Sequence, residues 1–200
     1  MTEQTSSQWK SRAIIIGVFL LFFLPILLSW YLVFFTDYKH DVKSGTQHGI
    51  LLDPPRQIEN VTLRDPLSGN DAPLYGKWTM FMIAEGDCYQ SCKENLYRMR
   101  QIRFAMGKEM HRVQRATYFA DENISKEADK HFADYTGQLL LSNNINEKFL
   151  SEFVVDSMTY ENAIYLIDPA GYLMMVYPES TEPSGIIKDL KKLLRISKTD

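Results

Sequence analysis

The feature that most restricts how this chain can fold is a long apolar segment near its start. Residues 13–35 contain no Lys, Arg, Asp or Glu. An α-helix rises about 1.5 Å per residue, so a segment of this length can cross a hydrocarbon core of about 30 Å. A single segment in lipid satisfies all its backbone hydrogen bonds only as a helix. We therefore predict a transmembrane helix over residues 13–35, preceded by a short tail, residues 1–12.

A cleaved signal peptide is the competing interpretation of this segment. Signal peptides have an apolar core of about 7–15 residues, followed by a cleavage site of small residues. Here the apolar run is longer, and residues 29–35 (SWYLVFF) offer no such site. A membrane anchor is therefore favoured. Lys10 and Arg12 precede the run and Lys39 and Lys43 follow it, so charge bias alone does not set the orientation.

A polar stretch separates the apolar segment from the rest of the chain. Residues 36–49 are mostly polar, and two prolines stiffen residues 53–56 (DPPR). These features predict a linker over residues 36–57 and one domain over residues 58–200. The formal net charge is only −3, and the basic residues are scattered among acidic ones. This pattern argues against a nucleic-acid partner.

Strand-like and helix-like patterns alternate through the predicted domain. A weak edge strand over 58–63 is followed by a turn over 65–73. Further strands are predicted at 77–84, 113–120, 139–141, 163–167 and 172–177, and helices at 88–110, 125–135, 144–153 and 183–196. Such an alternation predicts an α/β domain in which helices cover a mixed sheet.

Cys88 and Cys92 are the only cysteines, and they lie between a predicted buried strand and a predicted helix. Positions i and i+4 share one face of a helix, so the two sulfurs can meet if Cys92 lies in the first turn. A helix N-terminus also stabilises a thiolate. The pair therefore indicates a redox dithiol or a site for a soft metal. The absence of a second cysteine pair argues against structural zinc.

A purely structural disulfide is the alternative for this pair. Closing so short a loop constrains the unfolded chain little, so it contributes little stability. The junction between strand and helix is also an unusual place for a bond of purely structural value. We therefore favour a chemical role, with Cys88 and Cys92 as candidate catalytic residues and metal ligands.

Several segments resemble the Sco/SenC branch of the thioredoxin-like fold. The resemblance rests on residues 76–84 (GKWTMFMIA), the C-x-x-x-C motif itself and residues 94–99 (ENLYRM). It continues in residues 116–121 (ATYFAD) and 163–172 (AIYLIDPAGY). It extends over roughly residues 55–196, together with the apolar anchor.

The resemblance implies a cellular role. Members of that family are membrane-anchored, copper-binding assembly factors of cytochrome c oxidase. By resemblance, the expected partners are oxidase subunit II or other oxidase assembly factors. The expected location is the cytoplasmic (inner) membrane, with a single span and the main domain facing the periplasm.

The sequence departs from the family at three positions. Tyr89 and Lys93 stand where the family has prolines after the cysteines, and Tyr160 stands where it has a distal histidine ligand for copper. Two thiolates alone suit Cu(I), which is a soft cation. Met158 lies two residues from the histidine's position, and its thioether is the candidate third ligand for Cu(I).

Three functional hypotheses follow. The first is a thiol–disulfide oxidoreductase that acts through Cys88 and Cys92 while the oxidase copper centre is built. The second is Cu(I) handling by the same two cysteines. The third is a non-enzymatic assembly scaffold that keeps the Sco-like fold without a complete copper site.

Overall fold

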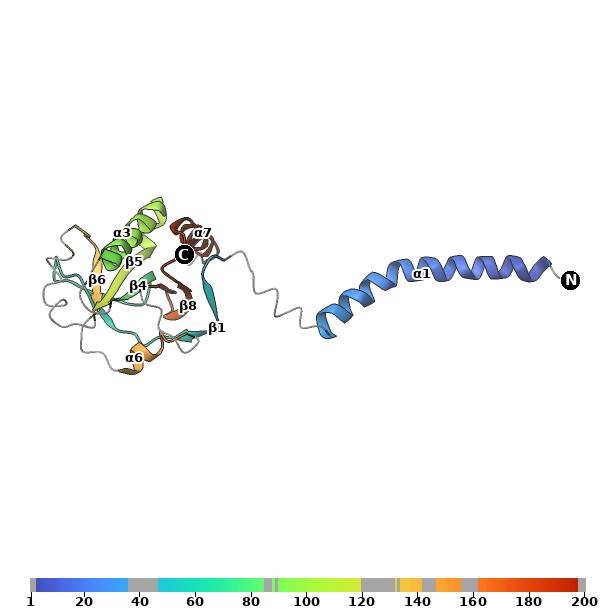
Figure 1. Ribbon diagram of the computed structural model, residues 1–200, viewed down its shortest axis with the longest axis horizontal. Coiled ribbons are helices and arrows are strands. Elements are labelled where there is room, and N and C mark those ends of the chain that lie inside the picture. Colours follow the sequence, from blue (N-terminus) through green and yellow to red (C-terminus); the bar gives the residue numbers. More distant parts are fainter. Residues whose placement is uncertain are drawn as a thin grey trace. The chain divides into compact units, whose positions relative to one another are not determined.

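The computed structural model divides the chain into two units, Met1–Thr46 and Gln47–Asp200 (Figure 1). It describes residues 3–35, 47–84, 88, 90–119, 132, 134–141, 147–155 and 162–197. The predicted helix over 125–135 therefore lies largely outside the described residues.

The first unit is dominated by one helix, α1, which spans Glu3–Phe35. It begins before the predicted start at residue 13. Its segment Ile14–Tyr31 is long and apolar enough to cross a membrane, and its side chains are exposed. Phe19 and Phe23 stack one turn apart, with ring centroids 4.0 Å apart. Pro25 lies inside the helix, as membrane helices tolerate.

A mixed β-sheet forms the centre of the second unit. Eight strands lie within the described residues, in the order β1-β8-β7-β4-β5-β6-β2-β3. Their bounds are β1 Ile50–Gln57, β2 Thr62–Arg64, β3 Asp71–Pro73, β4 Trp78–Ala84, β5 Val113–Phe119, β6 Gln138–Leu141, β7 Ile164–Ile167 and β8 Tyr172–Tyr177. β4 pairs in parallel with β5, and β5 with β6, whereas the other pairs are antiparallel. The predicted mixed sheet is confirmed.

Helices cover both faces of this sheet (Figure 1). They are α3 Gln90–Ala105, the 3₁₀ helix η1 Gly107–Arg112, α6 Glu147–Ser151 and α7 Pro183–Ile196. α3 and α7 pack on one face, in a cluster with Met80 and Met82 of β4. Phe81 of the same strand points to the other face and packs against Phe149 and Phe153. The alternation explains why every residue of β4 is buried.

The sheet begins earlier in the chain than the sequence suggested. Residues 50–57, assigned to the linker, form β1 and pair with β8 at one edge of the sheet. The pairing register shifts between Leu51 and Arg56, around Pro54 and Pro55. Prolines lack a backbone donor, so they are tolerated at an edge strand and at irregularities of this kind. Their stiffness therefore does not mark a linker here.

The helix after the cysteines ends before the predicted residue 110. α3 stops at Ala105, and Gly107, with a φ of +58°, begins the shorter η1. Met99 and Met106 are buried, whereas Met110, in η1, is 38% exposed. The predicted helix over 88–110 is therefore too long at its end.

Packing of α3 on the sheet gives a first prediction. Leu96 is fully buried, whereas its neighbour Tyr97 is 55% exposed. Leu96→Ala is expected to lower the free energy of unfolding by about 2–5 kcal/mol, because it leaves a cavity under α3. Denaturant titration measures this change. The matched variant Tyr97→Ala is expected to change it by less than about 0.5 kcal/mol. Equal effects of the two variants would contradict the observed packing.

Candidate functional site

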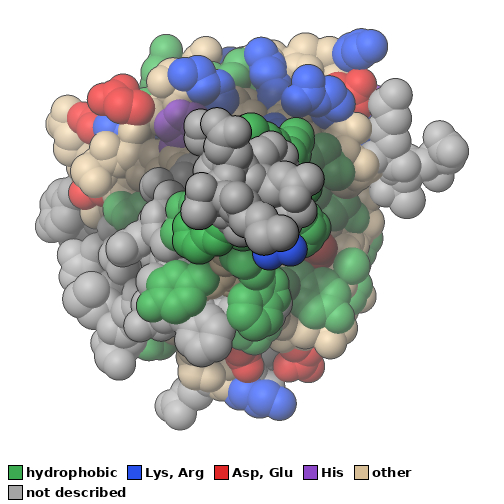
Figure 2. Space-filling model, turned by 90° about the vertical axis from the view of Figure 1, so that its right-hand side faces the viewer, with side chains coloured by type: hydrophobic (Ala, Val, Ile, Leu, Met, Phe, Trp, Pro, Cys, Tyr) green, Lys and Arg blue, Asp and Glu red, His purple; other side chains and the backbone are tan. Residues whose placement is uncertain are grey.

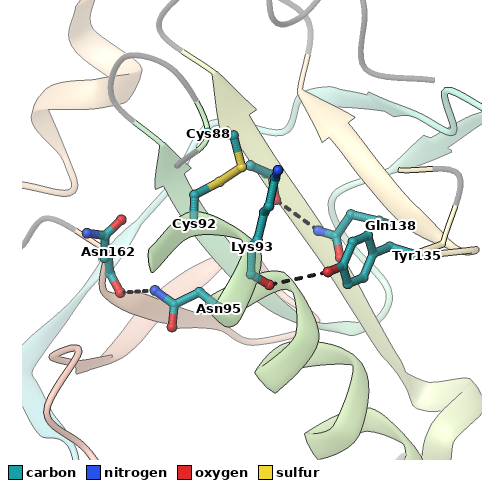
Figure 3. Close-up of a disulfide and its surroundings, with 8 residues drawn as sticks. Cys88, Cys92, Lys93, Asn95, Tyr135, Gln138 and Asn162 are labelled. Atoms are coloured by element: carbon teal, nitrogen blue, oxygen red, sulfur yellow. Dashed lines mark hydrogen bonds between the residues drawn. A yellow bond between two sulfur atoms is a disulfide. The ribbon is translucent and has the colours of Figure 1, made fainter. Parts of the chain in front are cut away.

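Cys88 and Cys92 are joined by a disulfide at the junction between β4 and α3 (Figure 3). Their Cα atoms are 5.2 Å apart. Cys92 lies in the first turn of α3, and Cys88 precedes that helix. The expectation that the two sulfurs can meet is therefore confirmed. The bond lies beyond the end of β4, which pairs in parallel with β5.

Both cysteines are largely buried. Cys88 is 7% exposed and Cys92 is 4% exposed, and both belong to the apolar cluster under α3 and α7. Of the residues beside them, 85–87 and Tyr89 lie outside the described part of the chain. Cys88 precedes the helix and is the more exposed of the two, whereas Cys92 is held within its first turn.

A polar side chain fixes the first turns of α3 to the segment that leads into β7. Asn95, only 1% exposed, donates from Nδ2 to the backbone carbonyl of Asn162 at 2.6 Å (Figure 3). Asn162 has a φ of +54°, a conformation that Asn adopts more readily than most residues. This hydrogen bond ties the start of the segment before β7 to the helix that carries Cys92.

Sequence reasoning missed Asn95 and Asn162. The available signal was the position of Asn95 within the buried stripe of α3, between Cys92 and Met99. A polar residue at such a position needs a partner, since an unpaired buried amide is costly. The identity of that partner could not be read from the sequence, because Asn162 lies 67 residues further along the chain.

Polar groups also line the other side of the first turns of α3. Gln138 donates from Nε2 to Thr117 Oγ1 at 2.9 Å, and both side chains are buried. The hydroxyl of Tyr135 lies 3.5 Å from the carbonyl oxygen of Lys93 (Figure 3). The Oε1 atom of Gln138 is buried without a hydrogen-bond partner. The disulfide therefore lies in an apolar cluster with polar side chains on two sides.

Three arginines, Arg100, Arg103 and Arg115, lie near one another. Arg115 of β5 is 1% exposed and donates to the carbonyl of Thr136 at 2.7 Å. Burial, together with the nearby charges of Arg103 and Arg100, lowers the pKa of Arg115 to about 10. Burial also lowers the pKa of Arg103. At about 10, the pKa of Arg115 keeps its guanidinium group cationic near neutral pH.

The structure brings together the two cysteines but tests no third copper ligand. Met158 and Tyr160 both lie outside the described residues. Within the described ranges, no cluster of three or more His, Cys, Asp or Glu side chains could hold a metal ion. In their reduced form the two thiolates fit Cu(I), a soft cation that thiolates select. The two thiolates alone lack the imidazole ligand that the family uses, and this ligand is the one that would suit Cu(II).

The fold and the junction disulfide define the class of protein. The domain has a mixed sheet with parallel strands at its centre and helices on both faces. A cysteine pair lies between a central strand and the next helix. These features are those of a thioredoxin-like domain. The family model described as "Transmembrane-like, thioredoxin-like, C-terminal domain" matches residues 78–197. The chain belongs to this family.

Solved structures support the same fold. ScoI of Bradyrhizobium japonicum with copper bound is 18% identical, with a TM-score of 0.52 over 68% of this chain and 99% of that one. BsSco is also 18% identical to this chain. Its structure is described as identifying a disulfide switch in a member of the Sco family of cytochrome c oxidase assembly proteins. Its TM-score is 0.53, over 72% of this chain and 96% of that one.

A second kind of thioredoxin-like protein is equally similar. A thiol:disulfide interchange protein from Bacteroides sp. is 18% identical, with a TM-score of 0.51 over 72% of this chain and 92% of that one. No curated protein matches the chain. Similarity to Sco proteins is thus confirmed at the level of the fold, which thiol–disulfide exchange proteins share.

Asn95 gives a prediction about the integrity of the site. Asn95→Ala removes the donor to the Asn162 carbonyl and is expected to lower the free energy of unfolding by about 1–3 kcal/mol. Chemical denaturation of the oxidised protein measures the loss. Glu94→Ala, at an exposed neighbouring position, is the matched control and is expected to change stability by less than about 0.5 kcal/mol. An unchanged Asn95→Ala protein would show that the hydrogen bond does not hold this segment.

Proposed function

We propose that this chain is a membrane-anchored thiol–disulfide exchange protein that assists assembly of the copper centre of cytochrome c oxidase. The observation that carries the proposal is the Cys88–Cys92 disulfide between β4 and α3. It joins the only two cysteines of the chain at the end of a fully buried strand. The link to the oxidase is carried over from the Sco-like fold.

The exchange step follows from the two positions. In the reduced protein, the Cys88 thiolate attacks one sulfur of a partner's disulfide and forms a mixed disulfide, releasing the partner's other sulfur as a thiolate. The Cys92 thiolate then attacks Cys88 Sγ, which closes the Cys88–Cys92 bond and releases the second partner thiolate. The pair loses two electrons, and the partner disulfide gains them. The bonded pair in the structure corresponds to the product of this step.

The polar backbone of α3 supports this chemistry. The N-terminus of a helix carries a partial positive charge, which stabilises a thiolate nearby. Cys88 precedes that terminus and is the more exposed cysteine, so we assign it the attacking role. We assign the resolving role to Cys92, which lies within the first turn of α3.

Membrane anchoring is the second part of the proposal. The helix α1 contains a segment of sufficient length and apolar character, and the matched family model is described as transmembrane-like. We propose one span in the cytoplasmic membrane, with the thioredoxin-like domain facing the periplasm. Disulfide chemistry of this kind operates in oxidising compartments such as the periplasm.

Trapping of the mixed disulfide tests the assigned roles. Cys92→Ser removes the resolving thiol, so this variant is expected to accumulate a covalent complex through Cys88, visible on a non-reducing gel and lost on reduction. Cys88→Ser is expected to yield far less of it. Ser91→Ala, between the two cysteines, is the matched control and should behave as the unmodified chain does. If Cys88→Ser accumulated a larger amount of the covalent complex than Cys92→Ser, Cys92 would be the attacking cysteine and Cys88 the resolving one.

A complementation experiment tests the link to the oxidase. In cells lacking this chain, the double variant Cys88→Ser/Cys92→Ser is expected to leave oxidase activity and copper content at the level of the deletion. The unmodified chain and Ser91→Ala are expected to restore both. Full restoration by the double serine variant would favour the scaffold hypothesis, because the fold would then suffice without the thiols.

Cu(I) handling is the competing chemistry at the same two residues, favoured by the copper-bound ScoI structure that shares the fold. If it operates, the fully reduced chain binds about one Cu(I), and Cys88→Ser abolishes the binding. Competition with a chromogenic Cu(I) chelator measures both. Met158→Leu reports whether the proposed third ligand contributes, since leucine keeps the bulk but removes the thioether. A reduced chain that fails to compete with the chelator would eliminate the carrier model.

A further inference from the structure

One face of α7 is basic and exposed. Lys188, Lys191, Lys192 and Arg195 are all exposed, and their spacing places them on one side of the helix. We call these four side chains the basic face of α7. The opposite side of α7 is buried against the sheet through Ile186, Leu190 and Leu194. Because that apolar side is fixed in the core, the basic face is held toward the surroundings.

Lys and Arg side chains gather along the upper edge of the face shown in Figure 2. In Figure 1, α7 lies at the upper part of the second unit, where α3 also lies. Within α7 the acidic residue Asp189 is buried and points away from the basic face. The exposed Glu182 lies at the N-cap, at the opposite end from Arg195.

The first residues of the second unit contact α7. The backbone N–H of His48 donates to Asp189 Oδ2 at 2.7 Å, and its ring Nδ1 lies 3.0 Å from Asp189 Oδ1. The hydroxyl of Tyr177 also donates to Asp189, at 3.4 Å. Gly185 lets His48 approach this closely, because a Cβ at that position would lie 2.7 Å from the histidine side chain. The start of the domain is therefore fastened to α7.

The connection to α1 is short. α1 ends at Phe35, and the second unit begins at Gln47. Even fully extended, the chain between these two residues spans only about 40 Å. If α1 crosses a membrane, the fastening point on α7 therefore stays within this distance of the bilayer surface.

We propose that the basic face of α7 docks on anionic lipid headgroups of the membrane that anchors α1. Each Lys or Arg close to an anionic bilayer strengthens binding about fivefold, and the short tether makes the encounter intramolecular. Ile196, at the end of the same helix, is 70% exposed and suits shallow insertion at the headgroup boundary. The inference rests on the membrane anchoring proposed above.

Lysine footprinting of the full chain in nanodiscs tests this docking. The protein is acylated at low dose in discs of neutral phosphatidylcholine and in discs containing phosphatidylglycerol, and each lysine is followed by mass spectrometry. In the anionic discs, Lys188, Lys191 and Lys192 are expected to react at least about fivefold more slowly. Lys148, exposed on α6 at the other face of the sheet, is the internal control and should react equally in both discs.

Salt and charge variants separate lipid attraction from other causes of protection. Raising the salt to about 0.5 M shortens the screening length and is expected to restore lysine reactivity. The double variant Lys192→Gln/Arg195→Gln is expected to weaken the protection of Lys188 and Lys191. The matched double variant Arg64→Gln/Lys93→Gln removes two exposed cations elsewhere and should leave the protection of Lys188 and Lys191 unchanged.

The outcomes distinguish docking from anchoring. Equal reactivity of the α7 lysines in neutral and anionic discs, with the protein retained in both, would overturn the docking proposal and leave the anchor intact. Protection that survives high salt would also overturn it, since it would indicate a protein contact. A chain that separates from the discs altogether would overturn the anchor and the docking together.

Discussion

Burial of β4 on both faces is the constraint on which the rest of the domain depends. This strand pairs in parallel with β5 on one side and antiparallel with β7 on the other. Its side chains alternate between a cluster under α3 and α7 and a second cluster that includes Phe149 of α6. A strand covered in this way has no solvent-facing side, so the chain leaving it must emerge at the end of the sheet. That exit is where Cys88 lies.

The disulfide and the helix that follows it are held from several directions. Leu96 and Met99 anchor α3 in the core, while the Asn95 hydrogen bond ties its first turns to the segment before β7. The cysteines are consequently placed by tertiary packing as well as by their four-residue spacing. Two thiols held in this way are preorganised for bond formation, because little conformational entropy remains to be lost when the sulfurs meet.

Periodic patterns predicted the central elements of this fold from the sequence. The apolar strand predicted before Cys88 corresponds to β4, and the helix predicted after it corresponds to α3. The strands predicted at 163–167 and 172–177 correspond to β7 and β8. In the turn between these two strands, Asp168 accepts hydrogen bonds from the backbone of Ala170 and Tyr172. Such signals are local, so a single sequence carries them.

Features that depend on distant partners could not be predicted in the same way. β1 contains two prolines and little apolar periodicity, and only its pairing with β8 makes it a strand. The bond between Asn95 and Asn162 and the fastening of His48 to Asp189 likewise join residues far apart in sequence. The sequence was therefore sufficient to predict the two cysteines of the site. The side chains that position these cysteines could be identified only from the folded structure.

Transfer of a disulfide between this chain and the oxidase is the most direct test of the central claim. Fully reduced protein would be mixed with oxidised subunit II, whose copper-binding cysteines form a disulfide, and both partners would be alkylated at intervals and analysed by mass spectrometry. The account predicts that Cys88–Cys92 bonds form as subunit II disulfides disappear, in equal amounts. Subunit II that stays oxidised in the presence of the reduced chain would contradict it.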